Sequence, residues 1–158
     1  MRMVFVFLLC LPGFASADTA RVNDLIDGFH QAASDSAFEN YFSRFAEDAY
    51  FLGTDASERW SVTEFKDYAR PAFSEGRGWT YKVVRRNLET VDGETFWFDE
   101  VLINKALGKC RGTGVVVKEN GEWKIAHYSL SLLIPNEIAD EIGLRSMEAD
   151  GILAHGRR

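Results

Sequence analysis

The spacing of apolar residues changes along this chain, from a helical period in the first half to an alternating period in the second. Over residues 22–33, 38–45 and 65–72, apolar residues recur every three or four positions, which predicts three amphipathic helices. A brief apolar run at 49–53 predicts a short strand between the second and third helices. The first half of the chain is therefore expected to be mainly helical.

Two Ser-x-x-Glu patterns mark where the second and third helices are expected to begin. Ser36 with Glu39, and Ser61 with Glu64, each predict a capping box, in which the two side chains bond backbone N–H groups of the first turn. Pro71 falls inside the third helix and is expected to bend or shorten it, because proline lacks a backbone N–H.

From Gly78 onward, alternating β-branched and aromatic residues predict four long strands. The dipeptides Asp92-Gly93 and Asn120-Gly121 favour hairpin turns, because glycine accepts positive φ. Two hairpins in series predict an antiparallel meander. The predicted strands span residues 79–91, 94–107, 109–118 and 122–134.

The predicted helices and strands are segregated along the chain, so the expected fold class is α+β, with three N-terminal helices on one face of a bent antiparallel sheet. A sheet that wraps around the helices encloses a cone, whose mouth favours a pocket. Residues 137–149 predict a further helix, and residues 151–158 a disordered tail. No repeat or Pro/Gly-rich linker divides the chain, which predicts one domain over residues 18–150.

Residues 1–17 predict an export signal. Arg2 precedes an apolar run from Val4 to Leu11, and Ala15-Ser16-Ala17 is a small-x-small cleavage site. A membrane-spanning helix needs roughly 20 apolar residues, about twice the length of this run. We therefore expect cleavage near Ala17 and a periplasmic or secreted protein with no membrane partner.

Charge and cysteine content narrow the range of functions. The net charge is −6, and loss of Arg2 makes it one unit more negative, which argues against a nucleic acid partner or an anionic membrane surface. Beyond the leader, Cys110 is the only cysteine, so we expect a structural thiol and no internal disulfide. Metal-ligand spacings, a GxSxG elbow and a phosphate-binding glycine loop are absent from the sequence, so no metal or cofactor is expected.

Two adjacent acids interrupt an apolar stretch in the second predicted strand. Asp99 and Glu100 alternate in direction, so one of them is expected to face inward, and the pattern leaves open which. An inward Glu100 is expected to pair with Arg111 on the next strand. Such a pair is either a structural ion pair or a pocket pair that orients a ligand or tunes an acid–base group, and a solvated outer face is the third possibility.

The histidines provide a second group of candidates. His127 shares a predicted strand face with Trp123 and Ile125, which predicts a shielded imidazole, either a general base near a carboxylate or a neutral core residue. Tyr128, on the opposite face, is a candidate ligand contact. His30 lies one position beyond the apolar face of the first helix and is expected to be partly exposed.

The polar loop at residues 53–60 ends in a large aromatic side chain. Trp60, Trp79 and Tyr50 are candidate walls of a pocket, although aromatic residues in a domain of this size are also common in the core. Asp55 is a candidate ligand-binding residue, but aspartates in loops usually cap turns, and we favour that interpretation.

A set of short motifs between residues 51 and 136 carries a resemblance to a known family that extends from about residue 22 to residue 142. They are FLGTD (51–55), ERW (58–60), GWT (78–80), FDE (98–100), RGTGV (111–115), WKI (123–125), HYSL (127–130) and IPN (134–136). Together they resemble the SnoaL-like domains of the nuclear transport factor 2-like superfamily. The resemblance implies a cone-shaped α+β roll with an internal pocket, commonly dimeric through the outer face of the sheet.

Members of that superfamily include ketosteroid isomerase-like and polyketide cyclase-like enzymes, dehydratases and non-catalytic binding domains, so the fold does not decide the function. In the enzymes, an acid or a His-Asp pair in the cone acts as general base, and the matching positions here are Glu100, Asp99 and His127. The aspartate base and the Tyr-Asp oxyanion pair of the isomerases have no matching residues, which argues against isomerase activity.

Three functions are compatible with these patterns. The first is binding of a small, partly apolar molecule, with Trp60 and Trp79 as walls and Arg111 as anchor for an acidic group. The second is proton transfer or hydrolysis on a small organic substrate, with His127 or Glu100 as base and Arg111 stabilising negative charge. The third is a homodimerisation module that uses the outer face of the sheet.

Overall fold

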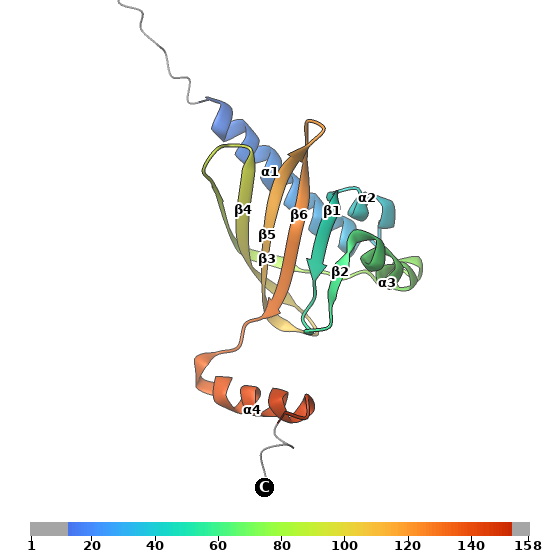
Figure 1. Cartoon of the computed structure of the whole chain (residues 1–158), viewed down its shortest axis with the longest axis vertical. Coiled ribbons are helices and arrows are strands. Elements are labelled where there is room, and N and C mark those ends of the chain that lie inside the picture. The colour runs from blue at the N-terminus through green and yellow to red at the C-terminus, as the bar shows by residue number, and fades with distance from the viewer. Residues whose placement is uncertain (1–12, 153–158) are drawn as a thin grey trace, which may run out of the picture.

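The computed structural model describes residues 13–152, in which three helices lie against a curled, unclosed sheet of six strands (Figure 1). The helices are α1 (Gly13–Ser34), α2 (Phe38–Phe42) and α3 (Val62–Ser74). The strands are β1 (Phe45–Leu52), β2 (Arg59–Ser61), β3 (Lys82–Thr90), β4 (Thr95–Asn104), β5 (Gly108–Glu119) and β6 (Glu122–Leu132). The predicted α+β class is confirmed, and β2 is an additional strand that the sequence pattern did not indicate.

The strands are arranged in the order β2-β1-β6-β5-β4-β3. The four long strands, β3 to β6, form the predicted antiparallel meander. Strand β1 lies parallel to β6 and antiparallel to β2, which extends the sheet beyond the meander. Local periodicity does not encode pairing between segments so far apart in the chain, so the β1–β6 pair was not predicted.

The two predicted hairpin turns differ in length. Asn120 and Gly121 have φ values of 52° and 83° and form the expected tight turn between β5 and β6. At Asp92-Gly93 the turn is longer, because residues 91–95 separate the last paired residues of β3 and β4. The Asp92 carboxylate holds this turn by accepting two backbone N–H bonds of 2.9 Å. The turn length sets the register of β3 against β4.

One predicted capping box is confirmed and the other is wrong. Ser61 and Glu64 bond each other's backbone N–H groups at the start of α3, which continues to Ser74 with Pro71 inside it. Ser36 does not cap α2. It has a φ of 53° in the tight link between α1 and α2, and its hydroxyl accepts a 2.8 Å bond from the Gly78 N–H. The hydroxyl therefore ties two distant segments together.

The hydrophobic core lies between α1 and the concave face of the sheet (Figure 1). Val22, Ile26 and Phe29 form the buried stripe of α1, at the spacing that predicted this helix. The sheet contributes alternate residues, which are buried because they face the helix: Phe96, Phe98, Leu102, Val116 and Ile125. The opposite face of the sheet is left uncovered by helices among the described residues.

Residues 1–12 of the predicted leader and residues 153–158 of the predicted tail lie outside the described residues. The predicted cleavage site at 15–17 falls in the first turns of α1, which begins earlier than expected from the pattern. After β6, a 3₁₀ helix, η1 (Asn136–Ile138), leads into α4 (Ala139–Ala149), in agreement with the predicted terminal helix. Within residues 13–152, no helix is both long and apolar enough to cross a membrane.

Candidate functional site

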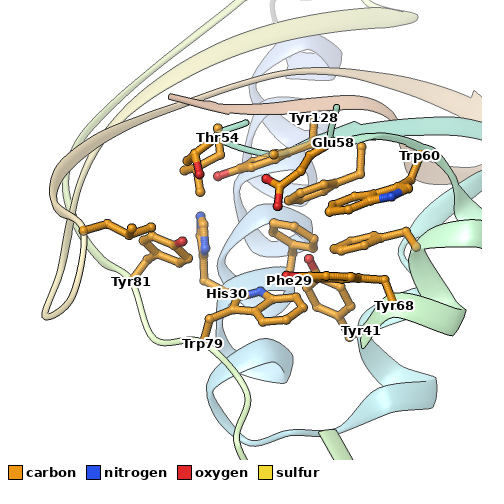
Figure 2. A pocket seen from close by; sticks show the side chains of 15 residues that line it. Phe29, His30, Tyr41, Thr54, Glu58, Trp60, Tyr68, Trp79, Tyr81 and Tyr128 are labelled. Atoms are coloured by element: carbon orange, nitrogen blue, oxygen red, sulfur yellow. The ribbon is translucent and has the colours of Figure 1, made fainter. Parts of the chain in front are cut away.

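A pocket of about 260 Å³ opens at the mouth of the curled sheet (Figure 2). This volume is near the lower end of the range for small-molecule sites, roughly 300–1,000 Å³. Most of the wall is aromatic. The lining residues are Phe29, His30, Tyr41, Phe51, Gly53, Thr54, Glu58, Trp60, Phe65, Tyr68, Trp79, Tyr81, Leu107, Tyr128 and Leu130.

One wall of the pocket consists of nearly parallel rings. Trp60 stacks on Tyr68 with 4.4 Å between ring centroids, and Phe65 stacks on Phe51 at 4.0 Å. The planes of Trp60 and Phe65 differ by 4°. A wall built from aligned flat faces suits a flat apolar guest, because aromatic rings pack best in offset stacks or edge to face.

The Tyr41 hydroxyl has no hydrogen-bond partner among the described residues, although its oxygen is buried in the pocket lining (Figure 2). The Trp79 indole lies near this oxygen but outside hydrogen-bonding geometry. Burial raises the pKa of Tyr41 well above its usual value, so the group remains a neutral phenol. An unpartnered buried hydroxyl costs about 1–3 kcal/mol, which an acceptor on a ligand can recover.

Beside the aromatic wall, His30 forms a buried pair with Glu100. His30 Nε2 lies 2.9 Å from Glu100 Oε1, and the side chains are 8% and 0% exposed. Because a carboxylate oxygen accepts, Nε2 carries the hydrogen and donates it. The other ring nitrogen, Nδ1, makes no hydrogen bond with a described residue, and the ring lines the pocket (Figure 2). In the neutral ring this arrangement leaves the lone pair on Nδ1.

Arg86 completes the buried network from the other side of Glu100. Its Nε and Nη2 atoms donate to Glu100 Oε2 at 3.1 Å and 2.9 Å. Nη2 also donates to Asp27 Oδ1 at 2.8 Å, and Nη1 to Asn23 Oδ1 at 3.1 Å, both on α1. The register of β3 against β4 puts Arg86 opposite Glu100 on the concave face. The carboxylate is thus compensated although it is fully buried.

Two further tyrosines supply hydroxyl groups to the lining. Burial raises the pKa of Tyr81 to about 12. Burial, followed by the nearby Glu100 charge, raises the pKa of Tyr128 well above its usual value. Both groups therefore stay protonated near neutral pH and can donate hydrogen bonds.

The predicted partner of Glu100 is wrong. Arg111 is exposed on the outer face of β5, opposite Val101, and the residue opposite Glu100 is Gly112. Glu100 does face inward, which was one of the predicted alternatives. The arginine that binds it, Arg86, comes from β3. Arg111 is therefore not available in the cone to anchor an acidic group.

His127 and Asp99 also lie on the outer face, away from the pocket. His127 is half-buried opposite Val115, and the next residue along the strand turns inward. Asp99 accepts hydrogen bonds of 3.1 Å and 3.2 Å from Asn87. Alternation places Asp99, because neighbouring residues in a strand point to opposite faces. The prediction that His127 shares a face with Trp123 and Ile125 is wrong, because a β-bulge between Ile125 and His127 shifts the register of β6 against β5 and turns Tyr128 inward instead.

Of the four aromatic candidates, Trp60, Trp79 and Tyr128 line the pocket. Tyr50 does not, because it lies on the outer face of β1, where the Arg59 guanidinium stands 3.9 Å above its ring. Its expected role as a pocket wall is therefore not supported by its position.

The loop at residues 53–60 brings Glu58, rather than Asp55, to the pocket. Asp55 is exposed and its Oδ1 accepts a 2.8 Å bond from the Ser57 N–H, which confirms that it caps a turn. Hydrogen bonds from the Ser57 hydroxyl and backbone lower the pKa of Asp55.

Three site residues, His30, Arg86 and Tyr41, were not predicted from the sequence pattern. His30 was expected to be partly exposed, but it lies four residues after Ile26 in the buried stripe of α1. Arg86 had a signal too, since Arg85 and Arg86 are adjacent and alternation turns one of them inward. Tyr41 had none, because a tyrosine on an apolar helix face is ordinarily a core residue.

No group of three or more His, Cys, Asp or Glu side chains within residues 13–152 is arranged to hold a metal ion. The Cys110 side chain is buried in the core, and burial raises the pKa of its thiol. The chemistry available at the pocket is therefore that of phenols, an imidazole and carboxylates.

Solved structures with similar folds come from several bacteria. An NTF2-like protein of unknown function from Pseudomonas putida KT2440 is 13% identical, with a TM-score of 0.65 over 77% of this chain and 91% of that chain. A domain of unknown function with a cystatin-like fold from Nostoc punctiforme PCC 73102 is 16% identical, with a TM-score of 0.65 over 85% and 87%. A candidate scytalone dehydratase from Novosphingobium aromaticivorans DSM 12444 is 12% identical, with a TM-score of 0.65 over 78% and 89%. These identities establish the fold alone.

The comparison with curated proteins gives no match. A family model described as a SnoaL-like domain matches residues 22–135, a segment that contains all six strands of the sheet and most of the helical layer. The similar solved structures agree with this assignment. The chain therefore belongs to the SnoaL-like domain family of the nuclear transport factor 2-like superfamily.

Proposed function

We propose that this chain binds a small, flat and uncharged organic molecule in the pocket of Figure 2. The observation that carries the proposal is an aromatic pocket with one unpartnered buried donor, the Tyr41 hydroxyl. The rings of Trp60 and its neighbours receive the apolar body of the ligand, and Tyr41 donates to an oxygen acceptor on it. Ligand sites in proteins commonly combine apolar walls with a few placed polar groups.

The charges around the pocket favour a neutral ligand over an acid. The residues that line it include no lysine or arginine, and Glu58 adds a carboxylate to the wall. The nearest cation of the network, Arg86, is already bound to Glu100 and Asp27. An anionic ligand would therefore lose its hydration without gaining a free positive partner.

The proposal is tested with three probes that share one ring system: naphthalene, naphthol and naphthoate. Binding is measured by isothermal titration calorimetry and by the rise in melting temperature. We expect naphthol to bind more tightly than naphthalene, and naphthoate to bind least. Binding that is strongest for naphthoate, or absent for all three probes, contradicts the proposal.

A matched pair of tryptophan variants localises the binding. Trp60→Leu removes a ring from the pocket wall, whereas Trp97→Leu removes one from the outer face, where Trp97 is 45% exposed. We expect naphthol affinity to fall in Trp60→Leu and to stay unchanged in Trp97→Leu. Equal losses in both variants would point to binding outside the pocket.

The buried network favours a second candidate function, proton transfer on a bound ketone. His30 Nδ1 would remove a proton from the carbon next to the carbonyl group, and the resulting enolate oxygen would accept a hydrogen bond from a phenol such as Tyr41. The Glu100 carboxylate, 2.9 Å from Nε2, would stabilise the imidazolium that forms. The proton then returns from Nδ1 to the carbon. The similarity in fold to a candidate scytalone dehydratase is compatible with an enzymatic function, but it identifies neither a catalytic residue nor a substrate.

Hydrogen exchange at carbon tests this second function directly. Tetralone is incubated with the protein in D₂O, and NMR follows the replacement of hydrogen by deuterium next to the carbonyl group. We expect faster exchange than in buffer, loss of the acceleration in His30→Gln, and no change in His127→Gln, which lies on the outer face. Exchange that survives in His30→Gln rules out this base.

We further propose that the protein is exported after cleavage near Ala17, because residues 1–17 have the arrangement of a signal peptide. The test is mass spectrometry of the periplasmic or secreted form, which is expected to begin at Asp18. A chain recovered only from the cytoplasm with Arg2 still present contradicts export.

A further inference from the structure

A second cavity, separate from the aromatic pocket, lies between α1, the end of α2 and the beginning of β6. Its volume is about 470 Å³, and it shares no lining residue with the pocket. We call it the polar groove, and its charged and amide side chains are Arg21, Asp24, Asn40, Arg44, Glu122 and Lys124. Three of these are cations, in a chain whose net charge is −6.

Contacts from β6 and α1 fix the position of Arg44 in the link between α2 and β1. The Ile125 N–H donates to the Arg44 carbonyl at 2.8 Å, and Lys124 Nζ donates to the Ser43 carbonyl at 2.9 Å. A Cβ at Gly28 would stand 2.6 Å from each of Cζ, Nη1 and Nη2 of Arg44. Equal distances to these three atoms mean that the plane of the guanidinium faces Gly28. The lack of a side chain at Gly28 therefore makes room for this cation.

The Arg44 side chain is half-buried and has few partners. Nη2 donates to Asn40 Oδ1 at 3.0 Å, and Nη1 donates to the Leu25 carbonyl at 3.4 Å. Nε is buried without an acceptor, and no carboxylate within residues 13–152 forms an ion pair with Arg44. Burial lowers the pKa of the Arg44 guanidinium, because it removes water from the cation. A cation in this position favours an anionic partner.

The other charges of the polar groove are paired or exposed. Lys124 Nζ lies 2.9 Å from Glu122 Oε2, and Arg21 Nη1 lies 3.5 Å from Asp18 Oδ1. The Asp24 side chain is exposed, so water weakens its interaction with other charges. The three cations and two acids of the lining leave an excess of one positive charge. Arg44 is the lining cation that no described acid neutralises.

We propose that the polar groove binds a small oxyanion, a carboxylate or phosphate group, through Arg44. Arginine suits such groups because its planar guanidinium donates parallel N–H bonds to two oxygens at once. Arg21 and Lys124 line the same groove and add to its positive charge. The groove lies outside the aromatic pocket, so this proposal does not depend on what the pocket binds.

Titration with sodium phosphate and with sodium acetate tests the site, and sodium chloride at equal ionic strength is the control. Proton–nitrogen NMR follows the Nε–H signal of Arg44, which is assigned by its loss in Arg44→Lys. We expect phosphate or acetate to shift this signal in a saturable way and chloride to leave it in place. The tighter of the two probes identifies the preferred oxyanion. If neither shifts the signal more than chloride does, the proposal is overturned.

Gly28→Ala tests the position of Arg44 without changing any charge. The added methyl group displaces the guanidinium, so we expect the affinity for the tighter probe to fall about tenfold. Alanine favours a helix more than glycine does, so α1 is expected to remain folded, which circular dichroism checks. Gly143→Ala, in α4, is the matched control, because a Cβ there meets no atom within 4 Å. Equal affinity in the two variants contradicts the proposal.

Removal of single cations separates a specific site from a general effect of net charge. Arg44→Gln is expected to abolish the shift caused by the probe, whereas Arg70→Gln, at an exposed position of α3, is expected to leave the affinity unchanged. Arg21→Gln changes a side chain that is 70% exposed and therefore leaves the fold intact, and it is expected to weaken binding about twofold. Calorimetry measures the three affinities. Equal losses in Arg21→Gln and Arg70→Gln attribute the binding to net charge and overturn the proposed site.

Naphthol, the probe of the aromatic pocket, shows whether the two sites are separate. We expect phosphate to leave naphthol affinity unchanged, and Trp60→Leu to leave phosphate affinity unchanged, because the two linings have no residue in common. Competition between naphthol and phosphate would place both in one site and contradict the separate groove. A chain that binds phosphate but not naphthol would overturn the proposed function of the pocket and support the polar groove.

Discussion

Charged residues on the concave face of the sheet are buried, whereas those on its outer face are in contact with solvent. On the concave face, Glu100 is fully buried and is bound by both His30 and Arg86. One position earlier in the same strand, Asp99 accepts hydrogen bonds from Asn87 on the outer face, and Arg111 is exposed there. A buried charge must be compensated, whereas a solvated one need not be. The face on which a residue falls therefore decides what its charge can do.

This difference bears on function, because a buried ionic network is rarely the most stable way to fill a core. Well-packed apolar residues of similar volume are often as stabilising or more so. In this protein the network lies beside an aromatic pocket and presents His30 to it. We infer that Glu100 and Arg86 serve to orient His30.

The largest expected effect comes from removing the buried acid. Glu100→Ala leaves Arg86 partly unpaired in the core and is expected to lower the free energy of unfolding by about 3–5 kcal/mol. Asp99→Ala, its neighbour on the outer face, is expected to change it by no more than about 0.5 kcal/mol. Urea unfolding measures both values. Similar losses of unfolding free energy in the two variants would contradict the proposed difference between the concave and outer faces.

A smaller effect is expected from adding a methyl group to the concave face. A Cβ at Gly112 would collide with the Tyr128 hydroxyl, so Gly112→Ala overpacks the site and is expected to cost about 1–3 kcal/mol. Thr113→Ala, on the outer face, is expected to change stability by only about 0.5 kcal/mol. Chemical unfolding tests the contrast, and naphthol titration shows whether displaced Tyr128 also narrows the pocket. An unchanged stability of Gly112→Ala would mean that Tyr128 moves freely.

Tyr41→Phe is expected to stabilise the ligand-free protein by about 1 kcal/mol, because it removes a buried hydroxyl that lacks a partner. The same change is expected to lower naphthol affinity and leave naphthalene affinity unchanged. Tyr50→Phe, on the outer face, serves as control and is expected to alter neither quantity. Thermal melts and calorimetry provide the measurements. A destabilised Tyr41→Phe protein would show that the hydroxyl has a partner in solution, such as an ordered water molecule.

The smallest effect concerns alkaline pH. The folded protein raises the pKa of Tyr81 to about 12, compared with about 10 for an unfolded tyrosine. Between these values the unfolded chain loses a proton that the folded chain keeps, so stability falls as pH rises above about 10. Melting temperature as a function of pH is expected to decline less steeply in Tyr81→Phe than in the wild type. Parallel curves would contradict the raised pKa.

Periodicity alone predicted the helical layer, the four long strands and the α+β class, because these depend on local spacing of apolar residues. It also showed that Asp99 and Glu100 must point in opposite directions. It did not identify the cation that Glu100 binds, since both Arg111 and the Arg85-Arg86 pair were available on neighbouring strands. The turn lengths decided this, because the longer turn at 91–95 aligned Arg86 with Glu100, and the β4–β5 turn aligned Gly112 with it.

The sequence by itself determined where this chain is helical, where it is extended and which family it resembles. Only the tertiary structure decided that His30, Tyr41 and Glu100 lie together around one pocket, and that Arg111 and His127 do not. The physical reason is that residue spacing records which side of its own element a residue occupies only where that element is regular, and the bulge in β6 turns His127 to the outer face. The partner on that side depends on strand register and on helix packing, and both are set by contacts between segments far apart in the chain.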